Sequence, residues 1–139
     1  MEVKTREAQQ GTRTETPKWT LAYLDIVETE ARKFLTDNQY THVVGLFDEL
    51  AYEPEPWRSQ TQNVEKIEDF YELKEKGGVL GKINVRVYFA IIDKRKLIMA
   101  LAAYKKEAEG QTPTHMIIRV RNRLRQAMKL LQQQIPKRE

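Results

Sequence analysis

The sequence contains no cysteine, which excludes disulfide frameworks, thiolate catalysis and cysteine-based zinc sites. Apolar runs are also short: the longest, residues 97–103, cannot span a bilayer, and the first twenty residues hold no signal-peptide core. Phosphate-binding glycine loops, paired metal-ligand histidines and nucleophile elbows are missing as well. We therefore expect a cytoplasmic protein with no metal site, no cofactor and no membrane association.

Charge is distributed unevenly along the chain. Residues 1–70 carry 8 Lys or Arg against 14 Asp or Glu, whereas residues 71–139 carry 16 against 6. A local excess of positive charge concentrates polyanions near a protein surface, so nucleic acid or an acidic protein segment is a plausible partner. The alternative is that the basic residues form a solvated surface whose charge the acidic half neutralises. Charge alone does not distinguish a binding surface from such a solvated surface.

A chain of 139 residues with 40% hydrophobic residues suits one compact domain. We place this domain at residues 18–135, with a short C-terminal tail at 136–139. Residues 1–17 are expected to form a flexible tail, because Val3 is their only large apolar residue and cannot offset the entropy of ordering.

Apolar periodicity predicts an α+β arrangement. The expected elements are, in order, a strand at 19–23, helices within 25–35 and 43–50, strands at 67–73, 83–92 and 97–104, and a final helix opened by Thr112 and Pro113. The run 83–92 alternates most clearly, which places Arg86 and Tyr88 on one face of its strand. A short polar turn at 93–96 predicts that the next strand forms a hairpin with it.

Basic and tyrosine side chains gather on three successive predicted strands: Lys74 on the first, Arg86 and Tyr88 on the second, and Tyr104, Lys105 and Lys106 at the end of the third. Cleavage of RNA through its own 2′-hydroxyl needs a proton acceptor, cations that stabilise the phosphorane, and an acid for the leaving oxygen. Arginine offers a planar fork, a desolvated lysine can approach a neutral pKa, and tyrosine can stack on a base. The same basic residues would also occur at a sheet edge where cations serve only solubility. From chemistry alone, this interpretation is favoured over an RNA-cleaving site.

The order of these residues resembles the RelE/ParE superfamily of bacterial toxins, most closely its HigB-like and phage-derived branch. The resemblance rests on YELK at 71–74, VRVYFA at 85–90, YKK at 104–106, and the Thr112-Pro113 start of an arginine-rich helix. It follows the element order from residue 19 to about residue 126 and is sequence-specific over 71–125.

This resemblance implies a twisted antiparallel sheet of three to four strands with two N-terminal helices and one C-terminal helix. It also implies the toxin component of a toxin–antitoxin module, many members of which bind the ribosomal A site and cut mRNA there. The implied partners are a cognate antitoxin, the ribosome and mRNA. The candidate catalytic residues are Arg86, Lys105 and Tyr88, and the candidate RNA-binding residues are Lys74, Lys106, Tyr104, Arg121 and Arg125.

Residues 132–139 contain no Tyr or His, whereas several active members of the superfamily place a catalytic aromatic or imidazole group there. Two alternatives to a metal-independent mRNA interferase therefore stay open. One is a non-catalytic RelE-like module that contacts RNA, the ribosome or a partner protein. The other, from the ParE branch, is a topoisomerase poison. We favour the interferase.

Overall fold

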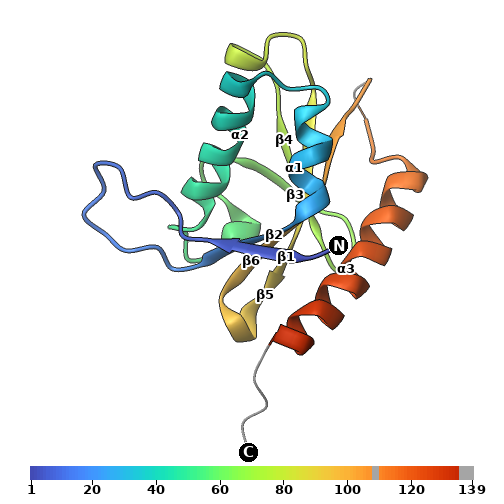
Figure 1. Cartoon of the computed structure of the whole chain (residues 1–139). Helices are drawn as coiled ribbons and strands as arrows, with labels where there is room; N and C mark the ends of the chain where they lie inside the picture. Colours follow the sequence, from blue (N-terminus) through green and yellow to red (C-terminus); the bar gives the residue numbers. More distant parts are fainter. Residues whose placement is uncertain (108–109, 135–139) are drawn as a thin grey trace, which may run out of the picture.

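The structure is a computed structural model that describes residues 1–107 and 110–134 (Figure 1). Its elements are β1 (Val3–Arg6), β2 (Thr20–Leu24), α1 (Asp25–Arg32), α2 (Asp37–Leu50), β3 (Asn63–Lys66), β4 (Tyr71–Glu75), β5 (Val85–Ile92), β6 (Leu97–Lys105) and α3 (Thr114–Gln134). Short 3-10 turns lie at Pro56–Arg58, Gly78–Leu80 and Asp93–Arg95. The C-terminal tail expected at 136–139 lies outside the described residues.

The strands of the described chain form one mixed six-stranded sheet in the order β1-β2-β6-β5-β4-β3. Strands β2 and β6 run parallel, and the other neighbours are antiparallel. The sequence predicts an antiparallel sheet of three to four strands, so the number of strands and the parallel pair are corrections. A parallel pair needs a long crossover, which α1, α2 and the strands β3 to β5 provide here.

The N-terminal segment departs from the expected flexible tail, because residues Val3–Arg6 form strand β1. Val3 is buried and is the Cα partner of Leu24 on β2. The Asp25 amide donates to the Glu2 carbonyl at 3.0 Å, which fixes the start of the strand. Backbone hydrogen bonds to β2 thus order this segment, although its apolar content alone is too low to offset the entropy of ordering.

Helices α1 and α2 pack on one face of the sheet, whereas α3 lies against the other (Figure 1). Phe47 of α2 meets Phe89 of β5 edge to face, with ring centroids 5.6 Å apart. Helix α2 begins with a capping box, in which the Gln39 amide donates to Thr36 Oγ1 at 3.2 Å and the Thr36 amide donates to Gln39 Oε1 at 2.9 Å. No helix of residues 1–107 and 110–134 has the length and apolar composition needed to cross a bilayer.

The predicted central hairpin is confirmed, because β5 and β6 pair antiparallel from Ile92 and Leu97 outward. Lys96 closes the turn in the left-handed conformation with φ 52°. The strand expected at 67–73 is shifted, because the Ile67 amide donates to the Phe70 carbonyl at 3.0 Å in a turn and β4 starts only at Tyr71, four residues after the predicted start. This turn connects β4 to the short edge strand β3.

Candidate functional site

The register of β4, β5 and β6 brings three of the predicted residues into one row. Lys74 is the Cα partner of Arg86, and Arg86 is the partner of Tyr104. Because side chains alternate along a strand, Glu72 and its partner Tyr88 form the next row on the same face. The predicted juxtaposition of these strands is therefore confirmed, while the roles of the residues stay predictions.

A buried carboxylate lies at the centre of this face. Glu72 is 1% exposed, and its Oε1 lies 3.7 Å from Arg86 Nε and 3.9 Å from Lys74 Nζ. The hydroxyl of Thr112 donates to Glu72 Oε2 at 2.6 Å, and Lys74 also pairs with Glu65 of β3. A charge at this depth requires paired and hydrogen-bonded partners. Two cations and one hydroxyl supply them.

Arg86 is held almost entirely inside the protein, with 3% of its surface exposed. Its Nη1 donates to Asn84 Oδ1 and to the Val85 carbonyl, the latter at 3.4 Å. Its Nε has no hydrogen-bond acceptor among the described residues. A cavity of about 150 Å³ opens beside the guanidinium, lined by Asn63, Lys74, Glu75, Lys76, Asn84 and Arg86. We refer to it as the arginine cavity.

Tyr88 is fully buried, and its ring meets Phe70 edge to face at 6.3 Å. Burial raises the pKa of its hydroxyl far above the ordinary tyrosine value, and the negative charge of Glu72 adds to this increase. Glu72 and Thr112 lie near the hydroxyl, which makes no hydrogen bond of good geometry within the described chain. In this conformation Tyr88 is a neutral core residue and does not reach a substrate.

The two lysines that follow Tyr104 take different positions. Lys105 is exposed and has Val85 as its Cα partner, so it points to the face opposite Arg86. The structure therefore does not bring Lys105, a predicted catalytic residue, beside Arg86, because alternation along β6 separates it from Tyr104. Lys106 is buried, and its amide donates to the Asn84 carbonyl at 2.9 Å next to the arginine cavity.

The two arginines predicted on α3 lie at the surface, away from the arginine cavity. Arg121 donates twice to Glu68, at 3.0 and 2.7 Å. This contact lowers the pKa of Glu68 and raises the pKa of Arg121. Arg125 is exposed one turn further along the helix. The structure therefore leaves Arg125 more accessible to a polyanion than Arg121.

Sequence reasoning missed four polar residues of this face: Glu72, Asn84, Thr112 and His115. His115 packs its ring edge-on against Tyr104, with centroids 5.9 Å apart. No signal in the sequence marks Glu72 as buried, because Lys74 and Glu75 in the same strand are charged as well. The described residues hold no group of three histidine, aspartate or glutamate side chains that could bind a metal ion.

The local charge of the site is nearly balanced. Lys74, Lys76 and Arg86 line the arginine cavity together with Glu75, while Glu65 and Glu72 pair with its cations. An incoming phosphate therefore competes with carboxylates for the same cations, and this competition weakens its attraction.

The arrangement of the elements defines an α+β fold of the RelE type, in which one strand is joined through two helices to an antiparallel three-stranded core. A solved structure of the E. coli toxin RelE, a double arginine-to-alanine mutant in the free state, matches with a TM-score of 0.54 and 16% identity. The match covers 78% of this chain and 99% of that chain. No protein-family model and no curated protein matches the sequence. The assignment to a HigB-like branch stays a prediction.

Proposed function

We propose that this protein is the toxin component of a toxin–antitoxin module and cleaves mRNA on the ribosome without a metal. The observation that carries the proposal is the contact of Glu72 with Arg86 and Lys74 beside the arginine cavity. The RelE-like fold supports the toxin assignment. A cytoplasmic location, a cognate antitoxin and the ribosome as partner belong to the same proposal.

In this mechanism each group on the sheet face has a distinct task. Arg86 binds the scissile phosphate and stabilises the dianionic phosphorane, because its guanidinium is already fixed by Asn84. Glu72 is 1% exposed and does not line the cavity, so it positions Arg86 and Lys74, while water accepts the proton of the 2′-hydroxyl and returns one to the leaving 5′ oxygen. Lys74 is the second cation, and Tyr104 offers a half-buried ring on which a base can stack.

The balanced charge of the site favours a second candidate, a non-catalytic RelE-like module that binds RNA, the ribosome or a protein. The cations at the arginine cavity are paired with Glu65 and Glu72, and Tyr88 is out of reach of a substrate. Such a module would occupy its partner without breaking a phosphodiester bond. Ribosome binding with no cleavage is the result that distinguishes it.

The test is cleavage of a translated message in a reconstituted translation system, with new 5′ ends mapped by primer extension. We expect Arg86→Ala to reduce cleavage on the order of 100-fold or more, because a preorganised charge is lost. Arg86→Lys should also be impaired, since an ammonium lacks the planar fork. Glu72→Gln keeps the size of the side chain but removes the charge that holds Arg86 and Lys74, so a loss of rate in the folded variant indicates that Glu72 positions these cations.

Lys105→Gln is the matched control, because Lys105 lies on the opposite face of the sheet and should be dispensable for cleavage. Each variant is checked for folding by circular dichroism. Cleavage that survives Arg86→Ala would refute the catalytic assignment. Wild-type protein that binds ribosomes without producing new 5′ ends would establish the binding module instead.

A further inference from the structure

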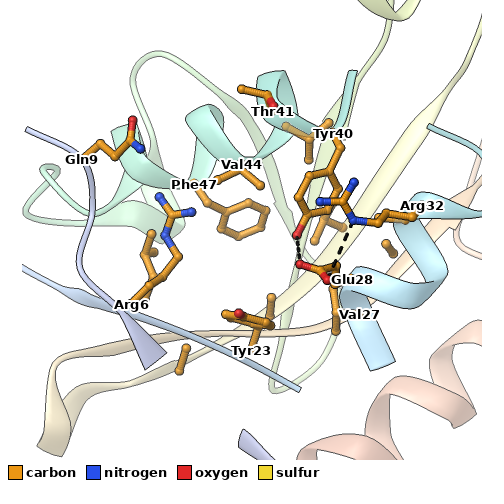
Figure 2. Close-up of a pocket in the computed structure, with 17 residues that line it drawn as sticks. Arg6, Gln9, Tyr23, Val27, Glu28, Arg32, Tyr40, Thr41, Val44 and Phe47 are labelled. Carbon is orange, nitrogen blue, oxygen red and sulfur yellow. Dashed lines mark hydrogen bonds and ion pairs between the residues drawn. The ribbon is translucent and has the colours of Figure 1, made fainter. Parts of the chain in front are cut away.

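A larger cavity of about 360 Å³ lies between the helices α1 and α2 and the strands β1, β2, β5 and β6 (Figure 2). Its lining includes Val87 and Ala103, which are Cα partners and alternate with Arg86 and Tyr104. The cavity is therefore on the sheet face opposite the arginine cavity. We refer to it as the alanine pocket.

Small side chains create this hollow. Four of the seventeen lining residues are alanines, and three of these face the cavity from α1 and β6: Ala31, Ala100 and Ala103. The cavity is partly open to solvent, so a ligand can enter it from the surface. Its volume falls within the range of small-molecule sites, which are mostly apolar with a few polar groups. Val27, Val43 and Phe47 complete an apolar wall.

One end of the alanine pocket offers a donor without an acceptor. Arg6 extends from β1 toward α2 beside Gln9 (Figure 2). Its Nη2 pairs with Asp48, but its Nε is buried and has no acceptor among the described residues. An unsatisfied buried donor destabilises the protein, and a ligand oxygen placed there would remove that penalty.

The other end is already satisfied. The Tyr40 hydroxyl donates to Glu28 Oε1 at 3.1 Å, and Arg32 Nε lies 3.8 Å from Glu28 Oε2. The Arg32 guanidinium also covers the Tyr40 ring at 4.1 Å. Tyr40, Glu28 and Arg32 therefore use their polar groups in contacts with one another. The polar group of a ligand would bind at the opposite end of the pocket, where Arg6 Nε has no acceptor among the described residues.

We propose that the alanine pocket binds a small molecule with an apolar body and a terminal carboxylate, the class of medium-chain carboxylic acids. The apolar body lies over the alanines, and a carboxylate oxygen accepts from Arg6 Nε. This site is independent of the RNA cleavage proposed above, because the two cavities lie on opposite faces of the sheet.

The experiment compares octanoate, 1-octanol and octylamine as probes of the full chain, by isothermal titration calorimetry and by chemical-shift perturbation. We expect saturable one-to-one binding of octanoate, roughly tenfold weaker binding of octanol because a charge-assisted hydrogen bond is lost, and the weakest binding of octylamine. The double variant Arg6→Gln with Asp48→Asn leaves no buried charge unpaired and should bring octanoate down to the affinity of octanol. Lys94→Gln, in the β5–β6 turn, is the control for charge removal.

Two pocket-filling variants test the location. Ala100→Leu fills the floor and Ala31→Leu fills the helix side, and either should abolish binding of octanoate and octanol while the protein remains folded by thermal unfolding. Gln126→Leu adds the same side chain to the exposed surface of α3 and should leave binding unchanged. No saturable binding of octanoate, or octanoate binding that both filling variants retain, would overturn the proposal. Octylamine binding as tightly as octanoate would overturn the role of Arg6.

Discussion

Arg123 of α3 and Glu30 of α1 form a bidentate ion pair over the free edge of β6. Strand β2 pairs with β6 only over residues 97–100, so the β6 backbone beyond that point has no strand partner on this side. The Ala103 amide donates to Glu30 Oε1 at 3.2 Å, and the Leu101 carbonyl accepts from Arg123 Nη1 at 3.1 Å. Arg123 also donates to both Glu30 oxygens, at 2.7 and 2.8 Å. The pair thus joins three elements.

Arg123→Ala removes this contact, so Glu30 keeps only the Ala103 amide and the more distant Arg119, and the Leu101 carbonyl loses the Arg123 donor. Removing one member of a buried ion pair destabilises a protein by about 3–5 kcal/mol. The side chains of Arg123 and Glu30 are 10% and 14% exposed, so water reaches the remaining carboxylate in part. Arg119 lies 3.9 Å from Glu30 and replaces some of the lost attraction. We therefore expect a loss of about 2–3 kcal/mol in the free energy of unfolding, below the fully buried range.

The assay is equilibrium unfolding in urea, with Arg121→Ala as the matched control. Arg121 belongs to the same helix and also makes a two-donor contact to a glutamate, but its side chain and that of Glu68 are 44% and 37% exposed. Exposed pairs contribute little, so this control should lose less than about 1 kcal/mol. The double variant Glu30→Gln with Arg123→Met should lose less than Arg123→Ala, since no buried charge remains. Equal losses for Arg123→Ala and Arg121→Ala would refute the reasoning.

Two further predictions concern Tyr40 of α2 and strand β1. Burial and the charge of Glu28 raise the pKa of Tyr40 to about 12. Because the folded pKa exceeds the unfolded value of about 10, this contribution to stability is present below pH 10 and lost as the pH rises toward 12. Tyr40→Phe should remove that part of the alkaline destabilisation, measured by urea unfolding from pH 8 to 12, and an unchanged pH dependence would contradict it. For β1, hydrogen exchange should be slower at Val3–Arg6 than at residues 11–16, and Val3→Ala should cost about 1 kcal/mol of unfolding free energy. Equal exchange in the two segments would contradict the strand.

Local patterns were sufficient to predict the centre of the sheet but not its edges. The alternation of 83–92, the short turn and the apolar run that follows specify the β5–β6 hairpin through neighbouring residues alone. Strands β1 and β3 have four residues each and little apolar content, and β1 exists because β2 offers it a backbone ladder. An edge strand of this kind forms only because a distant segment of the chain pairs with it, and the residues around it in the sequence do not reveal that partner.

The same distinction applies to the candidate site. Strand alternation places Arg86 and Tyr88 on one face, and the register then adds Lys74 and Tyr104. The burial of Glu72 could not be predicted, because it depends on Thr112 and on the segment that leads into α3. An acidic residue in a strand normally faces solvent, and only the packing of that later segment covers this one.

The charge separation along the sequence does not survive folding, because carboxylates of the acidic half pair with cations of the basic half. Glu30 binds Arg123 and Glu68 binds Arg121, both across segments that are far apart in sequence, and Glu65 binds Lys74 between the neighbouring strands β3 and β4. Attraction for RNA therefore depends less on net charge than on whether a phosphate displaces these carboxylates. Beside the arginine cavity the buried carboxylate of Glu72 contacts both Arg86 and Lys74, so it competes with a phosphate for these two cations and also holds them in place. Glu72→Gln should consequently strengthen RNA binding while it slows cleavage, because the two cations are freed for a phosphate but are no longer held in place; removal of a cation would weaken both.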